Sequence, residues 1–239
     1  MSGGLFVAGT GTSVGKTLVA AGLLRRLRAR GVDAVPMKPV QTGALRRADG
    51  SWLAPDLELA LSAAGLTVDA ETRAHLSPFC YAPACSPHLA ARIEGRPIEL
   101  DRIAASAQWL AQRHGALVVE AAGGVLVPLG EGALMVDLMA RLALPVVLVS
   151  PSGLGALNHA LLSLEALRAR GLAVLGVVLC DTAPASAEDR YIREDNGRAI
   201  AEIGRTRVLA RVPYLGDPVA WPSVDRWLSG CVELVGCRR

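Results

Sequence analysis

The segment GTGTSVGKT, residues 9–17, constrains the fold of this 239-residue chain more than any other part of the sequence. A continuous apolar run, residues 5–9, leads into it, and apolar side chains then recur with helical spacing over residues 16–30, before Gly31. The pattern predicts a buried strand, a glycine-rich turn and a helix in direct succession. Such a turn points its backbone N–H groups inward and the helix adds its positive end, so an anion is expected to bind here.

Strands and helices are predicted to alternate along almost the whole chain. Further strands are expected at residues 32–37, 116–120, 145–150, 173–180 and 207–212. Helices are expected at residues 56–64, 87–94, 100–114, 135–142, 155–170 and 187–203. Continuous Val- and Leu-rich strands separated by helices indicate a parallel sheet covered on both faces. We therefore predict a single α/β domain over residues 1–239, with a mostly parallel central sheet of about six to seven strands and helices on both faces.

Several polar or glycine residues stand where a predicted strand has just ended, namely Gly9, Lys38, Glu120 and Ser150. Ligands of parallel sheets bind at the carboxyl ends of the strands, so these positions predict one common site. The stretch of residues 44–86, with several Gly and Pro residues, is the least regular part of the sequence. We expect it to line or cover that site.

Composition excludes several classes of function. The chain is 51% apolar but only 4% aromatic, which favours a core of Ala, Leu and Val and offers no stacking platform for bases. The net charge of +3 is spread along the chain, and its densest cluster, Arg25, Arg26, Arg28 and Arg30, is interpreted as a solvated helix face rather than a nucleic-acid patch. Five cysteines without a C-x-x-C pair indicate neither a disulfide framework nor a zinc site. With no secretory signal and no membrane-length apolar run, we expect a cytoplasmic protein that binds neither membrane nor nucleic acid.

The glycine loop ends in the groups that a nucleoside triphosphate needs. Lys16 would reach the β and γ phosphates, and the Thr17 hydroxyl would bind Mg²⁺. Five residues separate Gly9 from Gly15, one more than in the usual G-x-x-x-x-G-K-[ST] pattern, but the preceding strand and following helix are those of the P-loop NTPase type. ATP and Mg²⁺ are therefore expected. The residues predicted to hold the nucleotide in this loop are Gly11, Thr12, Ser13, Val14, Gly15, Lys16 and Thr17.

Two acidic residues are candidates for completing a magnesium site, because nucleotide-bound Mg²⁺ takes only one or two protein carboxylates. Glu120 ends an apolar strand, where a charge is costly unless it pairs with a cation, and small residues follow it. Asp56 opens a predicted helix and is either a second metal ligand or an N-cap. Thr17, Asp56 and Glu120 are thus the predicted metal ligands. Asp137 is instead interpreted as a structural acid at a helix start.

Lysine is scarce in this chain: of its 25 lysine and arginine residues, only Lys16 and Lys38 are lysines. A lysine carries a compact ammonium, whereas the wide planar guanidinium of arginine does not fit the same narrow phosphate cradle. Chance survival in an arginine-rich sequence is the alternative. Lys38 lies in the segment KPVQTG at the end of the second strand, so we expect it to face the same crevice as Lys16.

A series of motifs occurs along the chain in the order GTGTSVGKT, KPVQTG, Asp56, SPHLAARIEGRPIE, VVEAAGG, LPVVLVS, GALNHALL and VPYL. In this order the sequence resembles dethiobiotin synthetase, the ATP-dependent carboxylase of biotin synthesis. The resemblance runs from residue 5 to about residue 215. KPVQTG and SPH beside the lengthened loop are more specific than the loop alone.

The resemblance implies that 7,8-diaminononanoate takes up CO₂ as a carbamate, that ATP converts the carbamate to a mixed anhydride, and that the second amine closes a ureido ring with release of phosphate. Such chemistry needs charge stabilisation and alignment more than a protein nucleophile. The resemblance implies catalytic roles for Lys16, Lys38 and Thr12. It also implies substrate contacts from Lys38, Thr42 and Gly123.

The resemblance also implies a homodimer in which the carboxylate end of the diamino acid lies near the subunit boundary. In this sequence that end would meet the helix start at residues 153–158, where free N–H groups suit an anion. Gly153, Leu154 and Asn158 are the expected contacts, with Tyr191 of a second copy. Gly153 and Gly155 are alternatively plain turn residues.

Cys180 and Asp181 stand where the resemblance suggests an Asn-Asp pair that contacts adenine. A thiol is a poor substitute for an amide, which donates and accepts together. We therefore expect weakened adenine selectivity, with nucleotide binding resting on the triphosphate and on backbone groups at Pro213, Tyr214 and Leu215. Two other departures, Ser13 in place of an acid and Ala121 in place of a glycine, remove no proposed ligand.

Three alternatives are compatible with parts of the sequence. A nucleotide-switched dimer of the partition or septum-positioning kind shares the sheet and loop, but such proteins carry an extra lysine at the place of Gly11. An amidoligase or cobyrinate-type synthetase shares the ATP-activating half, but no glutaminase-like nucleophile region is present. The segment 223–239 is either a helix that packs on the sheet or a membrane-surface helix.

Overall fold

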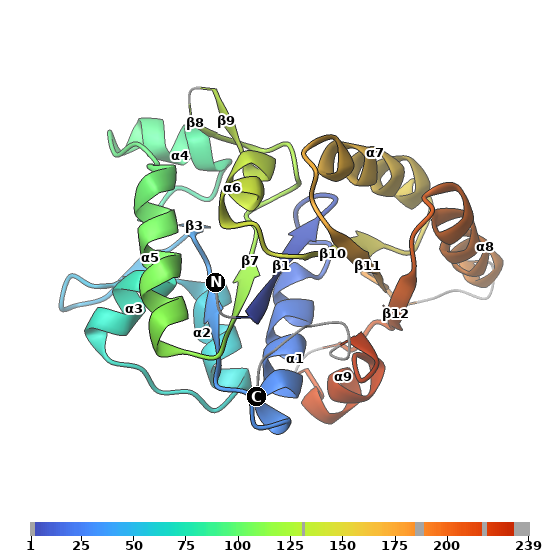
Figure 1. The fold of residues 1–239 in the computed structure, drawn as a ribbon, viewed down its shortest axis with the longest axis horizontal. Helices are drawn as coiled ribbons and strands as arrows, with labels where there is room; N and C mark the ends of the chain where they lie inside the picture. Colours follow the sequence, from blue (N-terminus) through green and yellow to red (C-terminus); the bar gives the residue numbers. More distant parts are fainter. Residues whose placement is uncertain (1–2, 131, 185–188, 217–218, 232–239) are drawn as a thin grey trace.

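A six-stranded parallel sheet crosses the middle of the molecule in the order β12–β11–β10–β1–β7–β2 (Figure 1). The computed structural model describes residues 3–130, 132–184, 189–216 and 219–231. The six strands are β1 (Gly3–Gly9), β2 (Ala34–Met37), β7 (Ala116–Glu120), β10 (Val146–Pro151), β11 (Val174–Cys180) and β12 (Val208–Val212). All neighbouring pairs run parallel, and Val7 of β1 lies opposite Glu120 on one side and Val147 on the other. The predicted fold class and all six predicted strands are confirmed.

Alternate residues of β1 enter two different hydrophobic cores, because successive side chains of a strand point to opposite faces. Leu5 and Val7 pack with residues of α1 (Lys16–Ala29), α2 (Pro55–Ala63) and the segment of α9 (Trp221–Trp227). Phe6 and Ala8 pack in the second core. That core draws on α3 (Ala70–Leu76), α4 (Pro87–Ile93), α5 (Leu100–Arg113), α6 (Met135–Leu142), α7 (Ala156–Ala169) and α8 (Asp189–Ile203). Helices therefore cover both faces of the sheet, as predicted.

Short elements outside the main sheet fill the stretch that the sequence left irregular. β3 (Val40–Thr42) pairs with β6 (Phe79–Tyr81), and β4 (Leu45–Arg46) forms a small hairpin with β5 (Trp52–Leu53). Beyond this stretch, β8 (Pro128–Gly130) pairs antiparallel with β9 (Ala133–Leu134). α3 was not predicted, although Asp69 caps it by accepting a hydrogen bond from the Thr72 N–H at 2.7 Å. β3 begins two residues after Lys38 and belongs with β6 to this separate two-stranded sheet.

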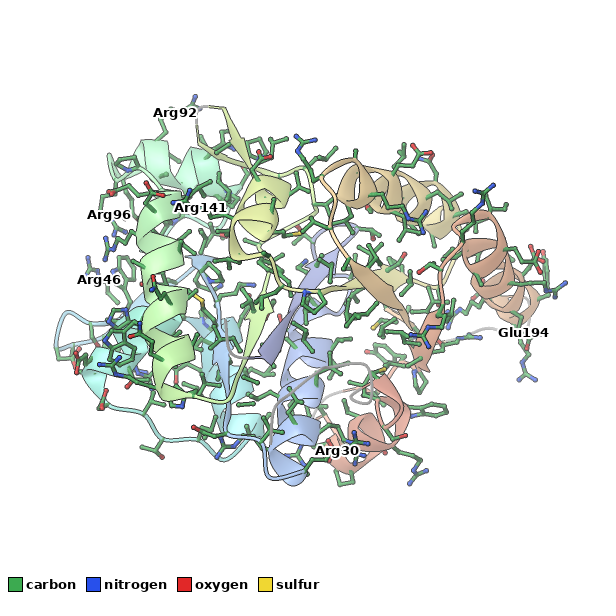
Figure 2. All side chains as sticks on the ribbon, in the orientation of Figure 1. Arg30, Arg46, Arg92, Arg96, Arg141 and Glu194 are labelled. Carbon is green, nitrogen blue, oxygen red and sulfur yellow. The ribbon has the colours of Figure 1, made fainter. Side chains whose placement is uncertain are left out.

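The arginine-rich end of α1 is partly a packing surface, which corrects its interpretation as a solvated face. Arg25 forms an ion pair with Asp225 at 2.9 Å and lies over the Trp221 ring, so it ties α9 to α1. Arg28 likewise pairs with Asp33. Figure 2 places Arg30 at the periphery of the molecule. The sequence pattern identified the charges but not the helix that packs against them.

The C-terminal segment packs against the domain as far as the structure describes it. Val224 and Leu228 are fully buried, and they contact α1 where Gly22 leaves room. Because these apolar side chains are buried against α1, they cannot contact a membrane. Of the two predictions for this segment, α9 is therefore the packed helix. Residues 232–239, the rest of the predicted segment, lie outside the described residues. Within the described part of the chain, no helix is both long enough and apolar enough to span a membrane.

The α1–α9 contact predicts the effect of Gly22→Ala. A Cβ atom at this position would lie 2.6 Å from both Val224 Cγ1 and Leu228 Cδ1. Overpacking of this kind costs about 1–3 kcal/mol and is only partly offset by a helix-propensity gain of about 1 kcal/mol. We expect chemical denaturation to show a net loss of about 1 kcal/mol in unfolding free energy.

Gly197→Ala in α8 is the matched control, because its Cβ would meet only Leu179 Cδ1 at 3.4 Å. This variant should be as stable as the parent chain or up to about 1 kcal/mol more stable. Equal stability of the two variants would contradict the packing argument.

Candidate active site

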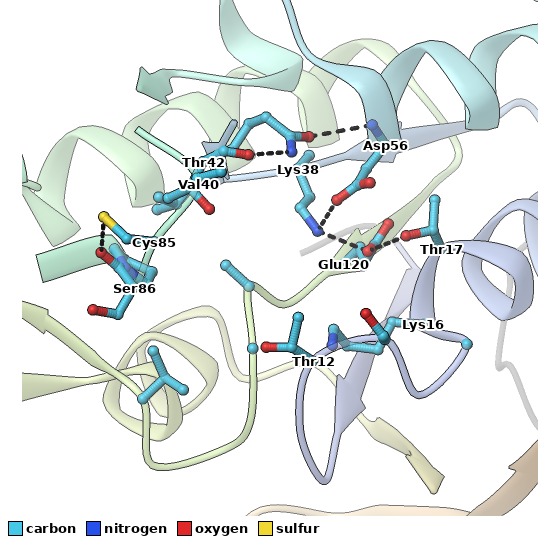
Figure 3. Close-up of a pocket in the computed structure, with 18 of the residues that line it drawn as sticks. Thr12, Lys16, Thr17, Lys38, Val40, Thr42, Asp56, Cys85, Ser86 and Glu120 are labelled. Carbon is cyan, nitrogen blue, oxygen red and sulfur yellow. Dashed lines mark hydrogen bonds and ion pairs between the residues drawn. The ribbon is translucent and has the colours of Figure 1, made fainter. Parts of the chain in front are cut away.

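A cavity of about 730 Å³ opens at the carboxyl ends of β1, β2 and β7 (Figure 3). These three strands are neighbours in the sheet, so the segments that follow them meet at one edge. The cavity brings together ten of the residues predicted for the site: Thr12, Ser13, Gly15, Lys16, Thr17, Lys38, Thr42, Asp56, Glu120 and Gly123. Ala84, Cys85 and Ser86 also line the cavity, as expected of the stretch of residues 44–86. Gln41, Pro87 and Val127 line it too and were not predicted.

The glycine loop follows β1 and ends at Gly15, whose φ of 99° is in the left-handed region that favours glycine. Gly9 is needed for a different reason: a Cβ there would lie 2.7 Å from Lys16 Cδ, so the lysine stem crosses the strand end at this point. The first turn of α1 has neither an acidic residue nor a side-chain cap. Its backbone N–H groups therefore remain available to an anion in the cavity. Two predicted loop contacts, Gly11 and Val14, are not among the described residues that line the cavity, and the Val14 side chain is buried in the core.

Lys38 is the centre of a buried ion cluster. Its ammonium lies 2.6 Å from Asp56 Oδ2 and 2.7 Å from Glu120 Oε1, and it donates to the Ala121 carbonyl at 3.1 Å (Figure 3). The Thr17 hydroxyl donates to the same Glu120 Oε1 at 2.8 Å. The cluster therefore joins the ends of β2 and β7 to the starts of α1 and α2.

The two lysines have opposite electrostatic environments. Burial and, to a smaller extent, the nearby Lys38 charge lower the pKa of Lys16 from 10.5 to about 8, although Glu120 and Asp56 oppose the shift. Within the described part of the chain, the Lys16 ammonium donates to the Gly11 carbonyl, at 2.6 Å, and to no other group. Burial also acts to lower the pKa of Lys38, but its contacts with Glu120 and Asp56 outweigh that effect and raise the pKa above 10.5. Lys38 is thus held in its charged form by two carboxylates, whereas the Lys16 ammonium has no ion pair with either of them.

Asp56 faces this cluster and does not cap its helix. The N-cap of α2 is Ala54 and Pro55 begins the helix, so the N-cap interpretation of Asp56 is wrong. The Asp56 backbone N–H donates to Gln41 Oε1 at 3.3 Å, and Gln41 Nε2 donates to the Thr42 carbonyl at 2.9 Å. Gln41 is buried and fixes the start of α2 against the segment after Lys38. Its role was not predicted, because only the folded chain places Gln41 beside Asp56.

Asp137 has the structural role expected of it. Its carboxylate accepts from the Leu134 N–H at 2.9 Å at the start of α6 and pairs with Arg170 at 3.1 Å. It does not line the cavity.

The oxygen donors of the cavity suit Mg²⁺. No group of three or more His, Cys, Asp and Glu side chains that could hold a metal occurs among the residues the structure describes. Thr17, Asp56 and Glu120 instead provide one hydroxyl and two carboxylates, the hard donors that Mg²⁺ uses together with substrate phosphates. Thr17 Oγ1 and Glu120 Oε1 are 2.8 Å apart, so the two oxygens are close enough that one ion could contact both.

A second cavity, of about 230 Å³, adjoins the loop and shares Ser13, Gly15 and Leu18 with the first. Of the predicted nucleotide contacts, it is lined by Cys180, Asp181, Pro213, Tyr214 and Leu215. It is therefore the candidate pocket for the nucleoside end of a nucleotide whose phosphates lie on the loop.

The side chains of Cys180 and Asp181 are largely engaged within the protein. Burial raises the pKa of the Cys180 thiol to about 12, and its sulfur would lie 2.8 Å from a Cβ at Gly15. The Asp181 carboxylate pairs with Arg193 at 2.8 Å and Arg211 at 3.3 Å and accepts from the Ser152 hydroxyl. Cys180 is thus a neutral packing group under Gly15, and the prediction of weakened adenine selectivity stands as a prediction.

The residues expected at the carboxylate end of the substrate lie outside the main cavity. Leu154 is 92% exposed and Tyr191 is 69% exposed, and Asn158 is also exposed. Gly155 has a φ of 85° and precedes α7, so it serves as a turn residue. Gly153 is held by Asn196, which donates to its carbonyl at 2.8 Å. One chain by itself does not bring these four predicted contacts to the cavity.

A parallel sheet with a glycine loop, a helix start and a lysine–hydroxyl–carboxylate cluster at its edge defines a nucleotide-binding protein of the P-loop class. A family profile described as AAA domain matches residues 3–221. The signal recognition particle receptor FtsY from Elizabethkingia anophelis aligns with 95% of this chain and 66% of its own, at a TM-score of 0.53 and 14% identity. This likeness shows the fold alone.

Sequence relatives are more specific. The ATP-dependent dethiobiotin synthetase of Anaeromyxobacter dehalogenans strain 2CP-C is 43% identical, over 90% of this chain and 91% of its own length. That of Anoxybacillus flavithermus is 36% identical over 89% and 92%. A biotin biosynthesis bifunctional protein of Bordetella avium is 42% identical over 94% of this chain and 42% of its own. The chain belongs to the dethiobiotin synthetase family.

The two lysine environments predict two separate titrations. With ¹³C-labelled lysine, the side-chain NMR signals should show one transition near pH 8, from Lys16, and a second that is incomplete at pH 10.5, from Lys38. Because the pKa of Lys16 is lowered on folding, its contribution to stability should become more favourable as the pH rises from about 8 to 10.5. The contribution of Lys38 should be lost only above pH 10.5.

Lys16→Met is the control, since it should remove the transition near pH 8 and leave the other. Two overlapping transitions near pH 10.5 would show that neither lysine is buried as described.

Proposed function

We propose that this enzyme converts 7,8-diaminononanoate, CO₂ and ATP to dethiobiotin, ADP and phosphate. The relatives named as ATP-dependent dethiobiotin synthetases support the activity. The observation that carries the mechanism is the placement of Lys16 and Lys38 on one cavity, beside Thr17, Asp56 and Glu120. The same cavity suits a triphosphate and an anionic second substrate, because both lysines are cationic at neutral pH.

The reaction proceeds by three bond-forming steps. One amine of the substrate adds to CO₂ and loses a proton, which gives a carbamate. A carbamate oxygen attacks the γ-phosphorus of ATP, the bond to the β-phosphate oxygen breaks, and ADP leaves. The second amine then attacks the carbamoyl carbon, the carbon–oxygen bond breaks, and the ring closes with release of phosphate and a proton.

The chain contributes alignment and charge rather than a nucleophile. Lys16 exchanges the Gly11 carbonyl for phosphate oxygens, which restores its full charge because an adjacent anion raises its pKa. Lys38 stabilises the carbamate and the transferring phosphoryl group from the opposite wall. Thr12 and Thr42 donate hydrogen bonds to the same groups, and Gly123 leaves space beside them.

Mg²⁺ is the expected metal, and Thr17, Asp56 and Glu120 are the residues that would hold it. When bound, it neutralises negative charge on the β and γ phosphates. The triphosphate is expected to lie along Gly11, Thr12, Ser13, Val14 and Gly15. The nucleoside is expected in the pocket of Cys180, Asp181, Pro213, Tyr214 and Leu215.

A homodimer would complete the substrate site. The exposure of Leu154, Asn158 and Tyr191 supports a boundary at this surface, since a second copy could bring Tyr191 towards the substrate carboxylate at Gly153. A cytoplasmic location accompanies the proposal, because bicarbonate, ATP and reduced cysteines are all available there.

The purified full chain with Mg-ATP and bicarbonate should release phosphate only when 7,8-diaminononanoate is added. One phosphate should form for each ring product detected by mass spectrometry, because the phosphate leaves from the activated carbamate. Phosphate release that is indifferent to the diamine would overturn the proposed activity.

Lys38→Arg is the matched variant in the same assay. We expect its turnover to fall to less than about a tenth of the parent rate, because a guanidinium fork does not fit between Asp56 and Glu120 as an ammonium does. Its thermal unfolding should show that the variant is folded. Retention of more than about a tenth of the rate would show that charge alone suffices.

A further inference from the structure

Lys38 contacts one oxygen of each carboxylate that is proposed to bind the metal. Of its three contacts, two are Asp56 Oδ2 at 2.6 Å and Glu120 Oε1 at 2.7 Å. These are the same carboxylates that are proposed to hold Mg²⁺. Glu120 Oε1 is engaged twice, because it also accepts from the Thr17 hydroxyl at 2.8 Å. Glu120 Oε1 therefore contacts both the Lys38 ammonium and Thr17, another proposed metal ligand.

A divalent ion and the ammonium cannot both keep these contacts without strong repulsion. An ion bound to Glu120 Oε1 at about 2.1 Å would lie no more than about 4.8 Å from the Lys38 nitrogen, since that nitrogen is itself 2.7 Å from the oxygen. The Lys38 side chain is only 6% exposed, so little water is present to screen the two positive charges. The Ala121 carbonyl is the only other partner of the ammonium among the interactions of the described residues, and it carries no net charge.

We propose that Lys38 is the resident counter-cation of the metal-binding carboxylates and that a divalent ion binds them by displacing its ammonium. The proposal rests on the assignment of Thr17, Asp56 and Glu120 as metal ligands, and it adds a second role for Lys38 to the one proposed in catalysis. A lone divalent ion must compete with a neutralising ammonium that is already in place. A nucleotide brings additional negative charge to the cavity, so ion and nucleotide are favoured together.

A displaced Lys38 ammonium would remain in the cavity. Lys38 lines the same cavity as Thr12, Lys16 and Thr42, so a released side chain remains inside it. Its charge then becomes available to an anion there, such as the carbamate or the transferring phosphoryl group. Metal and nucleotide binding would thus make Lys38 ready for the second substrate, which predicts an order of binding.

Lys16 provides the internal comparison. It lines the same cavity and is similarly buried, but its ammonium donates to the Gly11 carbonyl and forms no ion pair with Asp56 or Glu120. Removing the charge of Lys16 should therefore leave the carboxylates occupied, whereas removing that of Lys38 should free them.

Binding of Mn²⁺ to the full chain, measured by electron paramagnetic resonance without nucleotide or diamine, tests the proposal. Lys38→Met should bind Mn²⁺ at least about ten times more tightly than the parent chain, because two adjacent carboxylates lose their counter-cation. Lys38→Gln should do the same, and its amide can still hydrogen-bond to Asp56 or Glu120 if the Met variant does not fold. Lys16→Met should gain much less affinity than either Lys38 variant, since it keeps the Lys38 ammonium on Asp56 and Glu120.

Adding Glu120→Gln to Lys38→Met should abolish the gain, which would locate the ion at the cluster. Folded Lys38→Met or Lys38→Gln protein that binds Mn²⁺ no more tightly than the parent would overturn the proposal. The same holds if Lys16→Met shows an equal gain, because general loss of positive charge would then explain the result. None of these measurements uses the diamine, so their outcome is independent of the test of the proposed activity.

Discussion

The buried contact of the Lys38 ammonium with the Asp56 and Glu120 carboxylates is the interaction on which the site depends. It joins the ends of β2 and β7 to the start of α2, and Thr17 connects the same Glu120 oxygen to α1. A buried charge is tolerated only when it is paired and hydrogen-bonded, so each member of the cluster requires the others. The position of the glycine loop relative to the neighbouring strand ends follows from this constraint, and so does the shape of the cavity between them.

The regular part of the fold could be predicted from the sequence because its signals are local. Continuous apolar strands such as β7 and β10, and the glycine loop before α1, are each recognisable from a few consecutive residues. Elements that depend on distant partners could not be predicted. β3 and β6 are only three residues long and pair across a separation of about forty residues, and the packing of Arg25 against Asp225 joins opposite ends of the chain.

The candidate site divides in the same way. Its phosphate loop, lysines and carboxylates could be predicted because each stands at the end of a strand or the start of a helix. Gln41 could not, since a glutamine after Lys38 has no signature until Asp56 is folded beside it. Leu154 and Tyr191 remain outside the cavity of one chain, because a motif order along the sequence does not contain the distance between them and the lysines. The fold alone is shared with a receptor only 14% identical, so the relatives and the Lys38 cluster, and not the sheet, separate the synthetase from a nucleotide switch.

In the proposed site the Lys38 ammonium balances the two carboxylates until a divalent ion, bound together with a nucleotide, displaces it. The chain has only two lysines, so ¹⁵N-lysine labelling gives two side-chain ammonium signals that can be followed directly. With a non-hydrolysable ATP analogue alone, we predict that the Lys16 signal shifts while that of Lys38 stays in place. Adding Mg²⁺ should then move the Lys38 signal and increase its exchange with water. A Lys38 signal that does not change when Mg²⁺ and the analogue are both bound would show that the metal does not displace the ammonium.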